Sequence, residues 1–317
     1  PSAAALEEAG YPALLSAVLA AHGIADGPAA ADFLRIEDAL PLSPFLMKDM
    51  DRAVGRIRRA LERGEHIAVF GDYDVDGITA TAILVDYLRC SGARVSHYIP
   101  RRIEDGYGLS VDAMRALHDR GIDLVVTVDC GITGVEEVDF ANSLGMDVII
   151  TDHHEPGDTL PKAVANINPK IHPELADMHN LSGVGVAFKL GHAFLKYGRE
   201  HNLGGYMTEL KEVLDYVALG TVADIVPLLG ENRILVKHGM EMLKRQLRPG
   251  VRALIEVARI SSNSIKPSDI TFKLAPRINA AGRLGNAISA LQLLTASKIV
   301  DAYHYADMLE GFNQKRQ

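Results

Sequence analysis

The sequence predicts an α/β fold, a parallel sheet flanked by helices, followed by a mostly helical segment. Four short β-rich runs each follow a glycine and a polar step, at 63–70, 91–100, 120–128 and 144–151. Helical patterns such as 78–90 and 111–120 lie between these runs, and this alternation is typical of βαβ units. Acidic or imidazole side chains directly follow three of the four runs. Since the carboxyl ends of parallel strands share one edge of the sheet, these side chains should lie together.

The chain has 317 residues, enough for one large domain or two smaller ones. We expect an N-terminal helical region at 1–62, an α/β domain at 63–225, and a helical basic segment at 226–317 that ends in a connecting helix. No apolar run approaches the ~18–20 residues of a membrane span, and no signal peptide is recognisable. Cys90 and Cys130 are too few for a disulfide framework or a cysteine metal site. These features favour a reducing cytoplasm and no membrane partner.

The charge is unevenly distributed along the chain. The net charge of −8 argues by itself against a nucleic-acid partner. Residues 233–283, however, hold eleven lysines and arginines against three acidic residues, a net charge of +8, which leaves −16 elsewhere. A solvated helix face explains part of this segment, and a track for a polyanion explains the rest.

The stretch FGDYDVDG (70–77) places Asp72, Asp74 and Asp76 at every second position. Three carboxylates this close repel one another, and burial without a partner would cost several kcal/mol or raise their pKa values. An acidic turn in solvent is the simple alternative, with Asp72 capping the turn. A metal site is the other, because divalent cations stabilise such clusters.

Further ligand types follow the third and fourth runs. Asp129 comes after 120–128, and Asp152, His153 and His154 come after 144–151. Carboxylates with one or two imidazoles suit manganese, or magnesium, better than a thiolate-loving ion. The set is large enough for two ions ~3.5–4 Å apart, the arrangement used for phosphoryl hydrolysis. Asp129 is the natural bridge between them, and Asp152 could orient a histidine instead of binding metal.

A further acidic residue lies in ELKEVLDYVALGTVADIVPL (209–228). This stretch predicts a helix that ends near Gly220, with Asp224 before Pro227. The apolar neighbours of Asp224 favour a further metal ligand over a helix N-cap. The short G-V-G-V at 183–186 predicts the start of another helix, with its amides free to face a phosphate.

Four segments now carry a family resemblance. GDYDVDGITAT, VTVDCGIT, TDHHEP and ALGTVADIVPL, in this order, resemble the motifs of the DHH phosphoesterase superfamily. IPRRIEDGYGL (99–109), LSGVGVAFKL (181–190) and LAPRINAAGRLG (274–285) are similar to its RecJ-like branch, the single-strand-specific 5′→3′ DNA exonucleases. The resemblance covers the chain from about residue 30 to the end.

The resemblance implies specific roles for the residues that match the motifs. Two manganese or magnesium ions would be held by Asp74, Asp76, Asp129, His153 and Asp224. His154 would lie beside the scissile phosphate as a catalytic residue, together with Asp129 and with Asp72, which would contact an ion or its ligands. In the wider superfamily the residue four before Asp74 is often a histidine ligand. Phe70 stands there in this chain, so the first ion would have fewer protein ligands.

The same resemblance implies an activity. It is 5′→3′ exonuclease action on single-stranded DNA, releasing 5′-mononucleotides by two-metal activated-water attack on the phosphodiester, with a role in DNA repair and recombination. Single-stranded DNA would be the substrate of a monomeric enzyme, and a single-strand-binding protein or a helicase could be a partner. Such proteins continue into a smaller substrate domain with a glycine-rich motif. Because the chain ends at FNQKRQ (312–317), we expect that domain to be absent here.

Two groups of basic residues are candidates for contact with the DNA backbone. Arg101 and Arg102 follow the second run, and could grip a phosphate or form a solvated pair. Arg277 and Arg283 flank Asn279, and we expect one of these arginines to contact phosphate while a structural ion pair remains the alternative.

Three other functions stay open from the sequence. DVDGIT resembles the start of a haloacid-dehalogenase-type phosphatase, whose aspartyl nucleophile would leave the histidine pair unexplained. A DHH-type phosphoesterase could also act on small nucleotides or polyphosphate. Finally, the chain could be a non-catalytic DNA-binding scaffold on the same fold.

Overall fold

The computed structural model describes residues 2–34, 41–102, 106–172, 174–201, 209–284 and 286–316. The chain divides into two compact units at Pro41 and Leu42. The first unit consists of α1 (Ser2–Glu8), α2 (Ala13–Ala21) and α3 (Gly27–Leu34). It has a small core of its own, formed by Leu6, Leu19 and Ala30.

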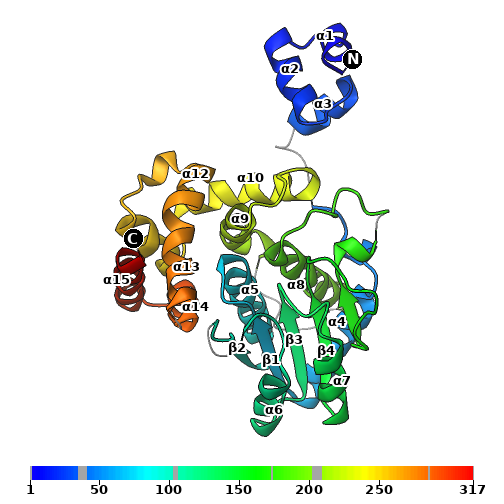
Figure 1. The fold of residues 1–317 in the computed structure, drawn as a ribbon, viewed down its shortest axis with the longest axis vertical. Coiled ribbons are helices and arrows are strands. Elements are labelled where there is room, and N and C mark those ends of the chain that lie inside the picture. The colour runs from blue at the N-terminus through cyan, green and yellow to red at the C-terminus, as the bar shows by residue number, and fades with distance from the viewer. Residues whose placement is uncertain are drawn as a thin grey trace. The chain divides into compact units, whose positions relative to one another are not determined.

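The second unit is built on a parallel sheet in the order β2-β1-β3-β4-β5 (Figure 1). Its strands are β1 (His66–Gly71), β2 (Arg94–Tyr98), β3 (Leu124–Val128), β4 (Asp147–Thr151) and β5 (Ala165–Ile167). All four pairings are parallel. The four predicted strands are therefore confirmed. The edge strand β5 was not predicted, because it has only three residues and no glycine precedes it directly.

Side chains alternate between two apolar layers along each strand, as parallel strands covered on both faces require. Ile67, Val69 and Val126 face the larger core, which also contains α5 (Val75–Cys90) and α8 (Gly183–Glu200). Ala68 and Val125 face the smaller core with α6 (Val111–Asp119) and α7 (Val135–Ser143). The predicted helices at 78–90 and 111–120 correspond to α5 and α6. Helices therefore cover both faces and leave the strand ends for the site.

Helix α4 (Met50–Arg63) belongs to the second unit, although the sequence suggested an N-terminal region to residue 62. Its apolar face, including Val54 and Ile57, enters the larger core. Arg56 also forms ion pairs of 2.5 Å with Asp147 and 2.6 Å with Glu65. The compact unit thus begins at Leu42, before α4. The domain boundary at residue 62 remains a prediction.

The remaining elements are helical. They are η1 (Pro44–Leu46), η2 (Pro169–Ile171), η3 (Leu210–Val213), α9 (Leu214–Ala223), α10 (Gly230–Arg245), α11 (Pro249–Val257), η4 (Ser262–Ser264), α12 (Pro267–Asp269), the π-helical η5 (Ile270–Leu274), α13 (Ala275–Arg283), α14 (Ala287–Leu294) and α15 (Ile299–Arg316). This confirms the predicted helical segment. Helix α9 runs three residues beyond the end predicted near Gly220. None of the described helices is both long and apolar enough to cross a membrane.

The helical segment shares the larger core with the sheet, so the two pack as one unit. Arg248, before α11, reaches Asp86 of α5 at 3.3 Å and Asp215 of α9 at 3.4 Å. Its guanidinium also lies 4.4 Å from the ring centre of Tyr216. These contacts anchor α11 to helices that position the site, and no separate compact unit begins at residue 226.

Candidate metal centre

The loops after three adjacent strands, β1, β3 and β4, bring acidic and imidazole side chains to one edge of the sheet. Three groups of residues form there, and within each group the ligand atoms lie within 4.8 Å of one another. They are Asp72, Asp74 and Asp129; Asp129, His153 and His154; and Asp76, His153 and Asp224. All seven acidic and imidazole residues assigned to metal binding or catalysis from the sequence therefore come together. Asp129 and His153 each belong to two groups.

The β1–α5 loop supplies the three alternating carboxylates. Asp74 is the N-cap of α5, and its Oδ1 accepts a hydrogen bond of 3.0 Å from the Gly77 amide. Capping is thus performed by Asp74, and not by Asp72 as the simple alternative supposed. Asp76, in the first turn of α5, accepts hydrogen bonds from the amides of Gly183 (2.7 Å) and Val184 (2.8 Å). Helix α8 begins at G-V-G-V as predicted, but its first amides hold the Asp76 carboxylate.

Asp129 follows β3, the middle strand of the sheet, and is 2% exposed. Its φ of +60° lies in the left-handed region, which a non-glycine residue adopts at a cost and often at functional sites. A Cβ on Gly183 would overlap the Asp129 carboxylate, so only glycine fits where α8 begins. Asp129 is therefore held close to the start of α8, and it belongs both to the group with Asp72 and Asp74 and to the group with His153 and His154.

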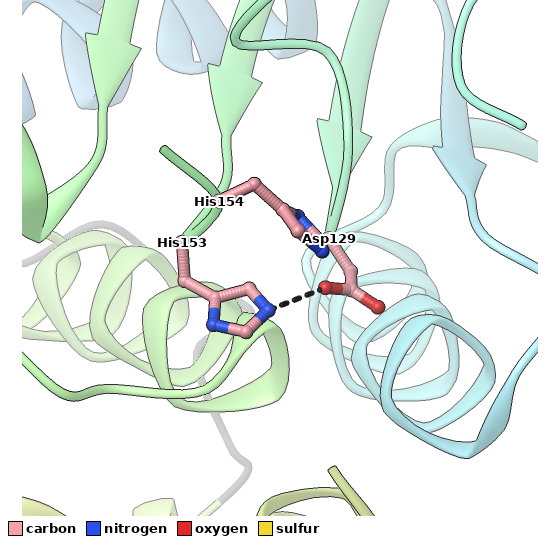
Figure 2. Close-up of side chains that lie close together, drawn as sticks. All are labelled: Asp129, His153 and His154. Carbon is pink, nitrogen blue, oxygen red and sulfur yellow. Dashed lines mark ion pairs between the residues drawn. The ribbon is translucent and has the colours of Figure 1, made fainter. Parts of the chain in front are cut away.

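The two histidines follow β4 and face different surroundings. His153 Nε2 lies 3.1 Å from Asp129 Oδ1, 3.6 Å from Asp224 Oδ2 and 3.8 Å from Asp76 Oδ2 (Figure 2 shows the Asp129 contact). Its side chain is nearly buried, whereas that of His154 is about half exposed. Nδ1 of His154 lies 2.8 Å from Asp152 Oδ1.

Asp152 uses its hydrogen-bonding capacity inside the protein. Oδ1 also accepts from the His153 and His154 amides, and Oδ2 accepts from the Ile132 amide at 2.9 Å. The geometry therefore matches the expectation that Asp152 orients a histidine. Asp224 enters from the C-cap of α9, not from an N-cap, and is followed by Ile225 at φ +63°. Phe70, four residues before Asp74, is fully buried, and its ring stacks on that of Tyr98 with 5.0 Å between the centroids.

Burial and mutual repulsion perturb the carboxylates in the absence of a cation. Burial, with Asp74 next, raises the pKa of Asp72 to about 7 and that of Asp224 to about 6. The pKa values of Asp76 and Asp129 lie well above the ordinary range, first through burial and then through neighbouring carboxylates. Burial, followed by the charge of His154, lowers the pKa of His153 to about 4. Neutral imidazole is the form that binds metal, and a divalent cation would favour ionised carboxylates.

Four buried polar atoms at this centre lack a hydrogen-bond partner among the described residues. They are Oδ1 of Asp72, Oδ1 of Asp129, Nε2 of His153 and Oδ2 of Asp224. Unpaired buried polar atoms are costly and call for an explanation. Oxygen and imidazole donors of this kind suit Mn²⁺ or Mg²⁺. The residues present therefore fit divalent metal.

A cavity of ≈ 310 Å³, which we call the arginine cavity, adjoins the carboxylates. It is lined by Asp72, Tyr73, Asp74, Arg102, Tyr107, Asn279 and Arg283. The Arg102 guanidinium lies 5.3 Å from the ring centre of Tyr73. Asn279 accepts from the Val75 amide at 3.2 Å and so ties α13 to the start of α5.

The other candidate arginines lie differently. Arg277 forms an ion pair of 2.6 Å with Glu310 of α15 and donates to the Lys273 carbonyl oxygen. Arg277 thus forms a structural ion pair, whereas Arg283 lines the arginine cavity. Arg101 is exposed and is not among the described residues lining the arginine cavity.

The contact between Tyr107 and His154 was not predicted from the sequence. The Tyr107 hydroxyl lies 3.1 Å from Nδ1 and 3.3 Å from Nε2 of His154, and 3.4 Å from the Asp129 carbonyl oxygen. No local pattern marks this contact, because Tyr107 and His154 are 47 residues apart. The hydrogen bonds from the Gly183 and Val184 amides to the Asp76 carboxylate were not predicted for the same reason.

Comparison with known proteins is consistent with this geometry. Residues 66–221 match the DHH family, N-terminal domain. The chain is 40% identical over 304 residues to the single-stranded-DNA-specific exonuclease RecJ of Bacillus subtilis (strain 168), covering 96% of this chain and 37% of that protein. It is 43% identical over 279 residues to RecJ of Escherichia coli (strain K12), covering 86% and 48%.

Solved structures give the same picture. A crystal structure of exonuclease RecJ bound to manganese aligns with a TM-score of 0.78 at 39% identity, covering 87% of this chain and 68% of that one. RecJ of Thermus thermophilus in complex with Mn²⁺ aligns with a TM-score of 0.81 at 34% identity, covering 100% and 43%.

The fold and the site define a parallel α/β protein with a carboxylate–imidazole centre suited to divalent metal. The chain belongs to the DHH family, in its RecJ-like branch. It spans less than half the length of the curated relatives described above.

Proposed function

We propose that the chain is the metal-binding part of a phosphodiesterase that degrades single-stranded DNA from the 5′ end and releases 5′-mononucleotides. The observation that carries this proposal is the cluster of four buried atoms that have no hydrogen-bond partner among the described residues, together with a cavity that Asp72 shares with two arginines. Its similarity to single-stranded-DNA-specific exonucleases supports the substrate, and RecJ structures with Mn²⁺ or Mg²⁺ support the metals. Asp74, Asp76, Asp129, His153 and Asp224 would hold two ions, with Mn²⁺ favoured.

Divalent ions bound there would supply Lewis-acid stabilisation of the phosphate and lower the pKa of water. Asp129 belongs both to the group of carboxylates and to the group that contains both histidines, which supports a role for it as a ligand of both ions. Asp152 holds one ring nitrogen of His154, which fixes the ring beside the substrate's phosphoryl oxygens. The hydrogen bond that the His154 ring donates to the Asp152 carboxylate, opposed by burial, raises the pKa of His154 and so favours a proton on the ring. His154 can then offset negative charge that develops during hydrolysis.

Arg102 and Arg283 both line the arginine cavity, which supports the binding of a strand phosphate there. This contact would orient a strand whose next phosphodiester reaches the metal ligands. Roles in repair and recombination, a cytoplasmic location, a monomeric state, and a single-strand-binding protein or helicase as partner belong to the same proposal. They rest on the similarity to RecJ.

The test is a time course on 3′-labelled single-stranded DNA with Mn²⁺, beside the same oligomer annealed to its complement. We expect stepwise loss of mononucleotides from the 5′ end of the single strand alone, and no product from Asp129→Asn. Asp158→Asn, at an exposed loop position, is the matched control and should retain activity. Absence of cleavage by the unmodified chain, or equal cleavage of the duplex, would overturn the proposal.

A second candidate is a phosphoesterase for small nucleotides, which the size of the arginine cavity favours. The same assay with a 5′-phosphorylated dinucleotide separates the two. A strand exonuclease should lose affinity steeply with salt on long DNA. An enzyme for small nucleotides should show a shallow dependence and prefer the dinucleotide.

A further inference from the structure

A second cavity of ≈ 300 Å³ shares Tyr107 with the arginine cavity, and we call it the glycine-loop cavity. It is lined by residues 107–109 and 131–134, Glu137, Asp152 and His154. Its volume is at the lower end of the range for small-molecule sites, about 300–1,000 Å³. His154, which lies beside the metal ligands, thus also forms a wall of this cavity.

The two cavities differ in charge. The arginine cavity contains Arg102 and Arg283, whereas no lysine or arginine is among the described residues that line the glycine-loop cavity. The latter instead contains the carboxylates of Glu137 and Asp152, and Asp152 is already fully hydrogen-bonded. A phosphate would be repelled there. The apolar side chains of Leu109 and Ile132, the Tyr107 ring and a glycine-rich backbone suit an uncharged, partly flat group.

Tyr107 lines both cavities and connects them to the centre. Its ring meets the His154 ring edge-on at 5.6 Å between centroids. A strand that places one phosphate with the arginines and the next at the metal ligands has a nucleoside beyond that second phosphate. The glycine-loop cavity, which Tyr107 and His154 both line, is where this uncharged group could lie.

We propose that the glycine-loop cavity is the subsite for the nucleoside beyond the scissile phosphate, the second nucleoside of the strand. This rests on the proposed function and adds to it a physical basis for recognising a nucleoside on that side. Stacking on an aromatic side chain tolerates any base, which suits an enzyme without sequence preference. The carboxylate of Glu137 can accept a hydrogen bond from a sugar hydroxyl or a base N–H group.

The test uses two ligands with equal charge. One is a 5′-phosphorylated thymidine dinucleotide in which methylene replaces the 3′ oxygen that joins the first sugar to phosphorus. The bond that hydrolysis would break is therefore absent. The other has a methyl group in place of the second nucleoside. Titration calorimetry with Mn²⁺ should show the dinucleotide binding about tenfold more tightly to the unmodified chain.

Thr133→Trp places a large side chain at an exposed position on the cavity wall. It should reduce the affinity of the dinucleotide to that of the methyl ester and leave the ester unchanged. Glu136→Trp, exposed in the first turn of α7 and not among the lining residues, is the matched control and should keep the difference. Circular dichroism establishes that both variants are folded.

Equal affinities of the two ligands for the unmodified chain would overturn the subsite, and so would a preference unaffected by Thr133→Trp. If DNA is nonetheless cleaved, the proposed function stands without this subsite. If neither ligand binds and DNA is not cleaved, both proposals fail.

Discussion

The buried ion pair between Lys189 of α8 and Glu231 of α10 offers a test of how the helices behind the site are held. Both side chains have no exposed surface, and Lys189 Nζ lies 2.5 Å from Glu231 Oε1. Nζ also donates to the Leu42 carbonyl oxygen at 2.6 Å, while the Glu231 carboxylate accepts from the Leu42 amide at 3.1 Å. Burial lowers the pKa of Lys189 and raises that of Glu231, and each partner opposes the shift in the other.

Lys189→Met leaves a carboxylate buried without its cation, which typically costs about 3–5 kcal/mol. Glu231→Met leaves the ammonium in the same position and should cost a similar amount. The double variant removes both charges and leaves only the Leu42 backbone groups without partners, at about 1–3 kcal/mol. We therefore expect it to be more stable than either single variant.

Urea unfolding followed by circular dichroism measures these free energies, and the four proteins form a double-mutant cycle. Lys244→Met is the matched control, because Lys244 pairs with Glu241 at 2.6 Å on the surface of α10. Surface pairs contribute about 0–1 kcal/mol. The reasoning is refuted if Lys189→Met costs no more than the control, or if the losses of the two single variants add in the double variant.

Three further predictions concern the site. Asp129→Ala should remove turnover more completely than Asp72→Ala, since Asp129 belongs to two ligand groups; equal losses in steady-state rates would contradict this. In EDTA the melting temperature should fall as pH rises from about 4 to 7, because the folded state keeps protons on Asp72 (pKa about 7), on Asp224 (pKa about 6) and on the buried Asp76 and Asp129, and the unfolded chain has lost these protons. These four carboxyl groups outweigh His153, whose pKa of about 4 has the opposite effect. Calorimetry with saturating Mn²⁺ should show this fall abolished, and a fall that persists would refute the link to metal. Arg283→Ala should weaken binding of single-stranded DNA and lower its salt slope by about one, whereas Arg277→Ala should leave that slope unchanged because Glu310 holds Arg277; equal slopes for the two variants would contradict the assignment.

Much of the fold could be predicted because its signals are local. The runs that became β1 to β4 are short and β-rich, and the helices between them are continuous in sequence. The three-residue β5 has no such signal, because its pairing with β4 is a tertiary event. Helix α4 packs into the larger core, and nothing in its own sequence indicates this contact with a sheet formed later in the chain.

The candidate site divides in the same way. That Asp72, Asp129 and His153 share an edge follows from parallel topology, which the alternation of strands and helices predicts. The partners of each side chain do not follow. Arg277 and Arg283 are equivalent in sequence, yet α15 supplies an acidic partner to Arg277 alone among the described pairs.

The sequence by itself determined the class of fold, the types of ligand and the edge at which they gather. The reason is that the alternation of strands and helices, and the residues that follow each strand, can be read along the chain. Only the tertiary structure decided which groups remain available for chemistry. Contacts between residues about 50–110 positions apart tie Asp76 to α8 and place Tyr107 between two cavities. Such contacts depend on how helices pack in three dimensions, and no periodicity along the chain encodes them.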